Sequence, residues 1–228
     1  VDIRFRDLEE VVARLEGMSH RRCMKSHTPL DGLPVGDDAH YLCVFRHPLD
    51  VHFSFRAHVR NVPMDVFDAS YPPDDPDGTT FRCFLEGEAA GEDCDSVPLA
   101  HIIRHYQAAK ALSDRSNVTL FHYADMKRDP ARAFDQIAKL LGISHSEALM
   151  AELVAASGFD NMKQHADRFA PSGGKGCFKS DAAFFDSGSD GKWHGKLTDA
   201  ELAGYDAMMD AALSPQDRAW LENGGPLG

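Results

Sequence analysis

The sequence predicts an α/β fold in which a parallel sheet is flanked by helices. Two apolar runs, YLCVF at residues 41–45 and NVTLFHY at residues 117–123, have the composition of buried strands. Each run is followed by a segment with helical features, because Pro48 and Pro130 both suit the first turn of a helix. Strands that alternate with helices along a chain pair in parallel.

The remaining elements are predicted from apolar periodicity and capping residues. Helices are expected at residues 6–17, 48–60, 97–113 and 130–142, and after Ser144, Thr198 and Ser214, each of which stands three positions before an acidic residue. A short strand is predicted at residues 22–26, and residues 61–96, which contain PPDDPDG, are predicted to be irregular. Two strands are too few for a stable open sheet, so others are expected in weakly patterned segments or before residue 1.

Composition argues against several classes of partner and site. The 24 basic and 36 acidic residues give a formal net charge of −12, which disfavours binding to nucleic acid and to acidic membrane surfaces. No apolar run approaches the ~20 residues of a membrane span, and the first residues lack the features of a signal peptide. The five cysteines lack C-x-x-C spacing and the twelve histidines lack ligand pairing, so no metal site is expected and a cytoplasmic location is predicted.

Residues 46–54 combine a cation, a helix start and a hydroxyl. Arg46 directly follows the first strand, His47 is the expected N-cap of the next helix, and Asp50 is expected to accept from the N–H groups of its first turn. Ser54 lies on the same helix. Ligands bind at the carboxyl edge of parallel sheets, and a guanidinium beside a hydroxyl suits a phosphate. The alternative is an ordinary strand-to-helix corner whose Arg46 pairs with a surface carboxylate.

This stretch resembles the arginine–serine phosphate motif, R-x-P-x-D-x-x-x-S, of the sulfotransferases that use 3′-phosphoadenosine-5′-phosphosulfate (PAPS). Three further segments resemble motifs of that family, in the family's order: KSHTPLDGLP at residues 25–34, YADMKRDP at residues 123–130, and SGFDNMK at residues 157–163. The resemblance extends from about residue 20 to the C-terminus. It implies a P-loop-NTPase-like sulfotransferase fold, with residues 1–228 forming a single domain that is expected to be incomplete at its N-terminus.

The resemblance also implies roles for the matched residues. His27 is the expected general base that takes a proton from the acceptor, and Lys25 is expected to place positive charge beside the leaving phosphate. The alternatives are a loop histidine and a solvated surface lysine. The expected cofactor contacts are Arg46, Ser54, Tyr123, Ser157, Phe159, Phe184 and Gly188, although core packing would explain the aromatic residues equally well.

The implied reaction transfers a sulfonate group from PAPS to a hydroxyl or amine of a small-molecule acceptor and leaves adenosine 3′,5′-bisphosphate (PAP). The alternative is a non-catalytic, sulfotransferase-like binding or scaffold module. Two departures from the family motivate it. The first is that the N-terminal phosphosulfate loop, P-K-x-G-T-T-W, is not found and is expected upstream of Val1. A P-loop kinase of related topology is a weaker alternative, since it needs a G-x-x-x-x-G-K-[ST] loop in the same place.

The second departure lies in residues 184–193, FFDSGSDGKW, which match the family's F-x-R-K-G-x-x-G-x-W. The family's basic pair binds the 3′-phosphate, but Asp186 and Ser187 stand there in this chain, and an aspartate repels a phosphate. Three outcomes are open: the loop lies further away, the cofactor binds more weakly, or the charge comes from Lys175, Lys179 or Lys192. The family's dimer motif is not kept either, so the oligomeric state is left open.

Overall fold

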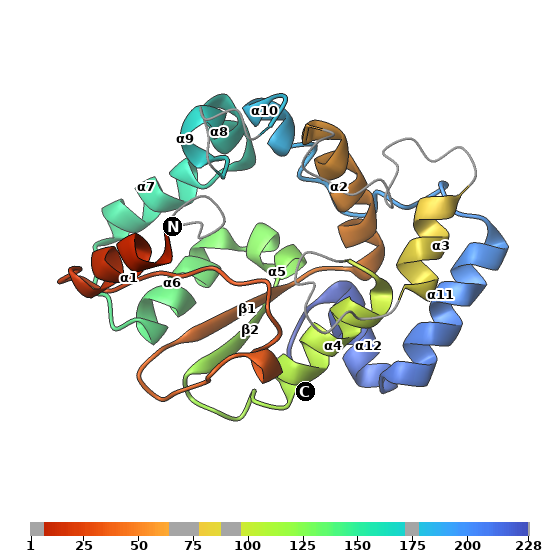
Figure 1. The fold of residues 1–228 in the computed structure, drawn as a ribbon, viewed down its shortest axis with the longest axis horizontal. Coiled ribbons are helices and arrows are strands. Elements are labelled where there is room, and N and C mark those ends of the chain that lie inside the picture. Colours follow the sequence, from red (N-terminus) through yellow and green to blue (C-terminus); the bar gives the residue numbers. More distant parts are fainter. Residues whose placement is uncertain (1–6, 64–77, 88–96, 172–177, 228) are drawn as a thin grey trace.

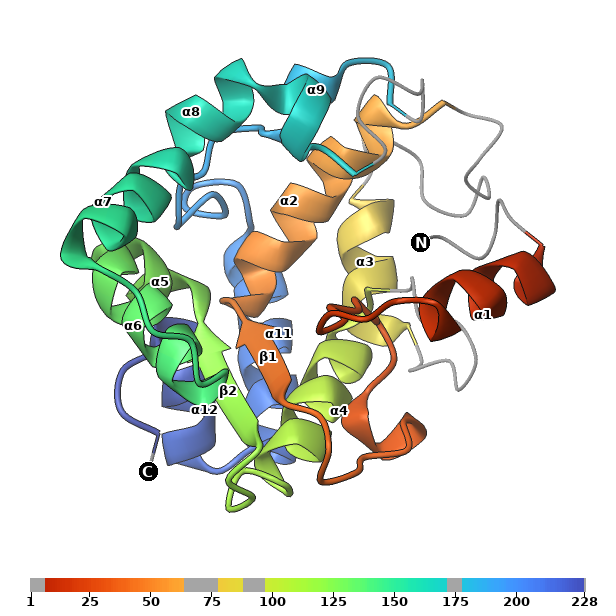
Figure 2. The same cartoon turned by 90° about the vertical axis from the view of Figure 1, so that its left-hand side faces the viewer.

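The computed structural model describes residues 7–63, 78–87, 97–171 and 178–227 (Figure 1). In chain order the elements are α1 (Leu8–Glu16), the 3-10 helix η2 (Leu30–Gly32), β1 (Tyr41–Phe45), α2 (Pro48–Asn61), α3 (Thr79–Glu86), α4 (Leu99–Lys110), β2 (Val118–His122), α5 (Tyr123–Arg128), α6 (Pro130–Leu140), α7 (Glu147–Ala156), α8 (Phe159–Gln164), α9 (Ala166–Phe169), α10 (Asp181–Phe184), α11 (Asp199–Ala212) and α12 (Pro215–Asn223). Figure 2 shows the two strands in the middle of the ribbon with helices around them. The predicted α/β class is confirmed.

The two strands pair in parallel, as predicted, with Tyr41 opposite Val118 and Phe45 opposite His122. Both strands therefore end at the same edge of the sheet, which brings the residues after β1 next to those after β2. Within the described residues the sheet contains these two strands alone. The strand predicted at residues 22–26 is wrong, because this exposed segment has no paired neighbour there.

The main core lies between the sheet and helices α2, α3, α4, α11 and α12. Phe45 at the end of β1 packs edge-on against Tyr106 and Trp220, with ring centroids 5.6 Å and 5.9 Å away. Leu49 on α2 and Leu221 on α12 are almost completely buried. Each such side chain contributes about 1.5–3 kcal/mol through burial, so the start of α2 is held firmly under the carboxyl edge of the sheet.

Histidines cap the helices that follow both strands. The Nδ1 atom of His47 accepts from the backbone N–H of Leu49 at 3.2 Å, which confirms its predicted place as N-cap of α2. In the same way His122 accepts from the N–H of Ala124 at 3.3 Å, while its Nε2 atom, 3.2 Å from the carbonyl of Leu221, donates to that oxygen. Burial is the main cause that lowers the pKa of both imidazoles, which favours the neutral form that capping requires.

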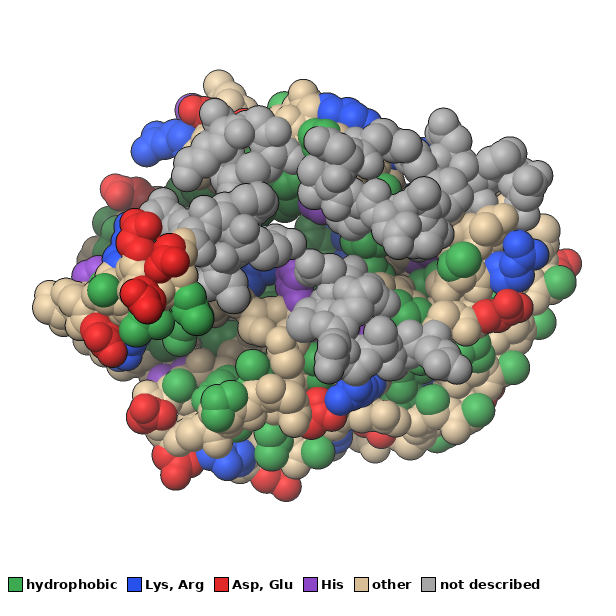
Figure 3. All heavy atoms as spheres, in the orientation of Figure 1, with side chains coloured by type: hydrophobic (Ala, Val, Ile, Leu, Met, Phe, Trp, Pro, Cys, Tyr) green, Lys and Arg blue, Asp and Glu red, His purple; other side chains and the backbone are tan. Residues whose placement is uncertain are grey.

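Most predicted helices are confirmed in position. At the first of them, the carboxylate of Asp7 accepts from the N–H groups of Glu9 and Glu10, and the acidic side chains of α1 are visible at the surface in Figure 3. The cap of α11, Thr198, and that of α12, Ser214, are also as predicted. None of the helices in the described residues has the length and apolar composition of a membrane span.

Two local predictions are wrong. The cap of α7 is Ser146 and not Ser144, because its hydroxyl accepts from the N–H of Leu149. Within the stretch predicted to be irregular, α3 forms because Phe81 and Phe84 bury one helical face in the core, a tertiary effect that overrides the polar surroundings. The rest of that stretch, residues 64–77 and 88–96, lies outside the described residues.

Candidate active site

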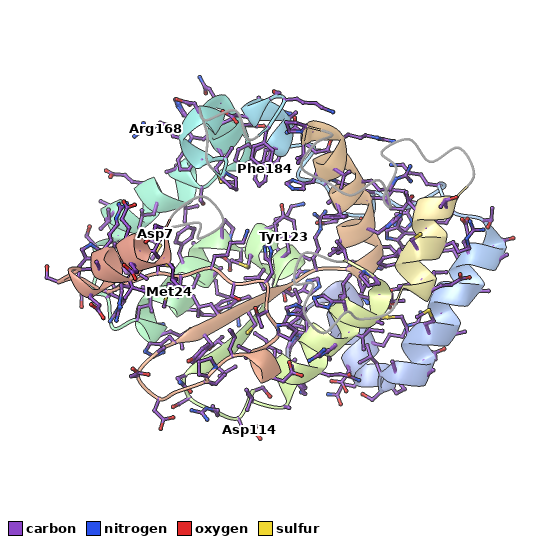
Figure 4. The ribbon with its side chains drawn as sticks, viewed as in Figure 1. Asp7, Met24, Asp114, Tyr123, Arg168 and Phe184 are labelled. Atoms are coloured by element: carbon purple, nitrogen blue, oxygen red, sulfur yellow. The ribbon has the colours of Figure 1, made fainter. Side chains whose placement is uncertain are left out.

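A cavity of about 240 Å³ lies at the carboxyl edge of the sheet, between α2, α5, α8 and α10. Six of the seven predicted cofactor contacts line it: Arg46, Ser54, Tyr123, Phe159, Phe184 and Gly188. Figure 4 labels two of them, with Tyr123 at the start of α5 and Phe184 at the end of α10. These residues are separated by up to 142 positions in the chain, and the parallel register and the packing of α2 bring them together.

One hydroxyl is shared by two cations at one end of this cavity. The Nη1 atom of Arg46 donates to Ser54 Oγ at 3.1 Å, and the Nζ atom of Lys192 donates to the same oxygen at 3.2 Å. Arg46 precedes α2 and Ser54 lies two turns into it, so the spacing in the motif places both groups on the same side. The cluster is suited to an anion that carries several acceptor oxygens.

The loop of residues 186–192 covers the cluster and is fixed by a buried carboxylate. Asp50 is only 2% exposed, and its oxygens accept from the backbone N–H groups of Gly191 at 2.9 Å and Lys192 at 2.7 Å. Asp50 was predicted to accept from the first turn of its own helix. That prediction is wrong, because the carboxylate accepts from the two N–H groups of the loop instead. Without Asp50 these N–H groups would be buried with no acceptor.

The backbone of this loop requires glycine at a point of close approach. Gly188 has φ +61, and a Cβ atom there would lie 2.6 Å from the ring of Phe159. A larger residue would therefore be strained and would displace an aromatic wall of the cavity. The match of Gly188 to the family motif thus has a steric reason in this chain.

Two cations lie against the ring of Tyr123. The guanidinium carbon of Arg46 lies 4.7 Å from the centroid of its ring, and the Nζ atom of Lys127 lies 5.5 Å from it. Lys127 also donates to the carbonyl of Gly188 at 2.6 Å and pairs with Asp190 at 2.9 Å. These contacts fix the ring at the cavity wall and join α5 to the loop.

Sequence reasoning missed Lys127 and Asp190. Lys127 stands in the recognised YADMKRDP segment, four positions after Tyr123, and that helical spacing could have placed it beside the ring. Asp190 carried no comparable signal, because its partners Lys127 and Arg46 are distant in the chain. Arg46 also donates to the carbonyl of Ser189 at 2.6 Å.

Asp186, the residue in place of a family arginine, also lines the cavity. Its carboxylate pairs with Lys192 at 2.8 Å, and this hydrogen bond is the main cause that lowers the pKa of Asp186. Asp186 is therefore charged at neutral pH, and the loop has not moved away from the site. The carboxylates of Asp186, Asp190 and Asp50 balance the cations around the cavity.

Three of the predicted site residues do not line the cavity. Ser157 ends α7, where its hydroxyl donates to the carbonyl of Val154 at 2.9 Å. Lys25 and His27 are exposed in the loop before η2. Met24, the neighbour of Lys25, is seen in Figure 4 beside α1 and away from Tyr123 and Phe184.

The segment that carries His27 contacts helix α4. Burial and, to a smaller extent, the nearby His101 lower the pKa of His105, and a hydrogen bond to the backbone of His27 acts in the opposite direction. The Nε2 atoms of His105 and His101 lie 3.1 Å apart. The loop is thus attached to the core through α4 and not through the cavity.

Comparison with known proteins decides the family. The family model for the sulfotransferase domain matches residues 1–216 of the 228. The chain belongs to the sulfotransferase family. The predicted family and its fold are thereby confirmed.

Similar proteins agree with this assignment. A glycolipid sulfotransferase of Mycobacterium tuberculosis is 31% identical over 248 residues, which cover 98% of this chain and 76% of the relative. One of Mycobacterium bovis is 30% identical over 249 residues, with the same coverage. A crystal structure of a mouse sulfotransferase complexed with PAP has a TM-score of 0.72 and 21% identity, and the match covers 90% of this chain and 70% of the other. At 21% identity, this similarity is evidence for the fold alone.

Proposed function

We propose that this sulfotransferase moves a sulfonate group from PAPS to a hydroxyl or amine of a small-molecule acceptor. The observation that carries the proposal is the cavity where Arg46 and Ser54 meet the rings of Tyr123, Phe159 and Phe184. A guanidinium and a hydroxyl suit a phosphate, and aromatic rings suit an adenine. These residue types fit the nucleotide, which supplies an activated sulfonate group when bound.

The roles proposed for the residues follow from their positions. Arg46 and Ser54 bind a phosphate, and Tyr123, whose ring contacts Arg46 and Lys127, orients the base. His27 accepts the proton that the acceptor loses as it attacks, and Lys25 lies two residues before it with positive charge. Because the His27 loop is exposed, the acceptor is proposed to approach from the side of that loop.

A hydroxyl on a sugar of a glycolipid is the first acceptor to test. The proposal draws on the two mycobacterial relatives, which are glycolipid sulfotransferases. Amines remain a second class of acceptor. The cytoplasmic location and the organisation of residues 1–228 as one domain remain predictions.

A non-catalytic binding module is the second candidate function. It is favoured by the position of Asp186 in the cavity wall, where a carboxylate opposes an incoming phosphate. Such a protein would keep the fold and lack turnover. Nucleotide binding and turnover must therefore be measured separately.

Calorimetry with PAP, followed by an acceptor screen with labelled PAPS, tests the proposal. We expect saturable binding of PAP and transfer of label to hydroxyl acceptors. Absence of binding at millimolar PAP would refute the nucleotide site. Binding of PAPS without transfer to any hydroxyl or amine acceptor would favour the non-catalytic module.

A further inference from the structure

We propose that Lys192 replaces the family's missing basic pair as the cation that binds the 3′-phosphate of the nucleotide; this inference rests on the proposed function. The candidates for this charge in the sequence are Lys175, Lys179 and Lys192. Lys175 lies outside the described residues. Lys179 donates from Nζ to the carbonyl of Arg60 at 2.8 Å and does not line the cavity. Lys192 does line it, and its side chain is only 9% exposed.

The ammonium of Lys192 lies beside the groups that the motif assigns to phosphate. It is 3.2 Å from Ser54 Oγ, which also accepts from Arg46 at 3.1 Å. A hydroxyl has two lone pairs and one hydrogen, and both lone pairs of Ser54 are used by the two cations. Its own O–H is then left as a donor. A guanidinium, an ammonium and a hydroxyl donor therefore converge at one point. Three donors together suit a ligand group that supplies acceptor oxygens, such as a phosphate.

Lys192 reaches this position because the loop backbone is fixed. Asp50 accepts from the N–H groups of Gly191 and Lys192, so the first atoms of the lysine side chain are set by a buried carboxylate. From that anchor the side chain extends along α2 to Ser54, one helical turn after Asp50. The charge that two adjacent residues supply in the family thus comes here from a residue four positions after Gly188.

The partner of Lys192 in this structure is Asp186, 2.8 Å from its Nζ atom. The side chain of Asp186 is 49% exposed, so it can turn toward water when another anion reaches the lysine. An ammonium has three hydrogens, and Lys192 can keep its bond to Ser54 while it exchanges the carboxylate for a phosphate oxygen. Asp186 therefore acts as an internal competitor of the phosphate, and removing its charge should strengthen nucleotide binding.

Calorimetry with two nucleotides tests these roles. PAP carries the 3′-phosphate, whereas adenosine 5′-monophosphate lacks it. In Lys192→Met, which keeps the aliphatic stem, we expect PAP affinity to fall about ten- to hundredfold and that of the monophosphate to change little. Asp186→Asn should bind PAP more tightly than the wild type. The matched control, Lys179→Met, removes the same charge outside the cavity and should bind both nucleotides like the wild type.

The outcomes separate this inference from the proposed function. Failure of the wild-type protein to bind PAP would refute the function and this inference together. If the wild type binds PAP and Lys192→Met binds it equally well, or loses both nucleotides alike, only the role of Lys192 is refuted. Should Lys192→Met fail to fold, Asp186→Asn decides: tighter PAP binding supports the competition at Lys192, and unchanged or weaker binding overturns it.

Discussion

The cavity at the strand ends and the loop that carries Lys25 and His27 differ in how firmly their side chains are held. Around the cavity, Arg46 and Lys192 are largely buried and bonded to neighbouring elements. Lys25 and His27 are exposed in a segment without regular structure. The difference indicates that the cavity, where we propose that the nucleotide binds, is preorganised for binding. It also predicts that substitutions on the two sides change different measured quantities.

The largest effect is expected for His27→Ala. Loss of the proposed general base should lower turnover by about hundredfold or more, because proton removal from the acceptor is then left to water. PAP affinity should stay near the wild-type value, since His27 does not line the cavity. Steady-state kinetics and calorimetry measure the two quantities. His20→Ala, an exposed histidine earlier in the same loop, is the control, and equal loss of turnover in both variants would contradict the role of His27.

Arg46→Ala should weaken PAP binding by about 2–4 kcal/mol, as expected when one partner of a largely buried charge pair is removed. The guanidinium also fixes Tyr123, so Arg46→Lys should recover only part of the affinity. Calorimetry measures the effect, with Arg104→Ala as the control, because Arg104 pairs with Asp31 at the surface. If Arg46→Ala and His27→Ala changed PAP affinity equally, the two regions would not have the separate roles proposed.

Asp50→Asn tests how firmly the loop is held. We expect the free energy of unfolding to fall by about 2 kcal/mol, because asparagine has one acceptor oxygen where aspartate has two, so one of the two loop N–H groups loses its acceptor. The attraction to the guanidinium of Arg46 is lost as well. Denaturant titration measures it. Asp37→Asn removes a carboxylate from an exposed pair with Arg115 and should cost at most about 1 kcal/mol. Similar losses in both variants would show that Asp50 does not anchor the loop.

The smallest effect concerns pH and the capping histidines. Burial lowers the pKa of His47, so the unfolded chain binds more protons than the folded protein below about pH 6.5. Stability should therefore rise as pH rises through that region and be lost on acidification. His47→Asn keeps an acceptor for the N–H of Leu49 without titrating, and should reduce the change in unfolding free energy between pH 5.5 and pH 7.5. An unchanged pH dependence would exclude His47 as a contributor.

Local chemistry made much of the fold predictable. The apolar runs of β1 and β2, the N-cap at His47 and the caps at Thr198 and Ser214 depend on neighbouring residues, which a sequence displays directly. Contacts between segments that are distant in the chain were harder to predict from the sequence. The acceptor role of Asp50 toward Gly191, the pairing of Asp190 with Lys127 and the helix α3 all depend on tertiary packing.

The candidate site shows the same division. Arg46 and Ser54 are eight positions apart on one strand–helix corner, so their hydrogen bond follows from spacing. Among Lys175, Lys179 and Lys192, no property of the sequence identified the lysine that reaches Ser54. Only the path of the loop over α2 distinguishes Lys192 from Lys179.

The anchor at Asp50 has a consequence for the speed of ligand entry. If the loop swung away from α2, a carboxylate that is 2% exposed would lose both of its backbone donors, so such opening is unfavourable. Asp186, in contrast, is half exposed and needs only a side-chain rotation to release Lys192. Rotations of exposed side chains take picoseconds to nanoseconds, whereas loop motions extend to microseconds. Association of a phosphate ligand should therefore be limited by diffusion and orientation, with no slow gating phase in stopped-flow traces.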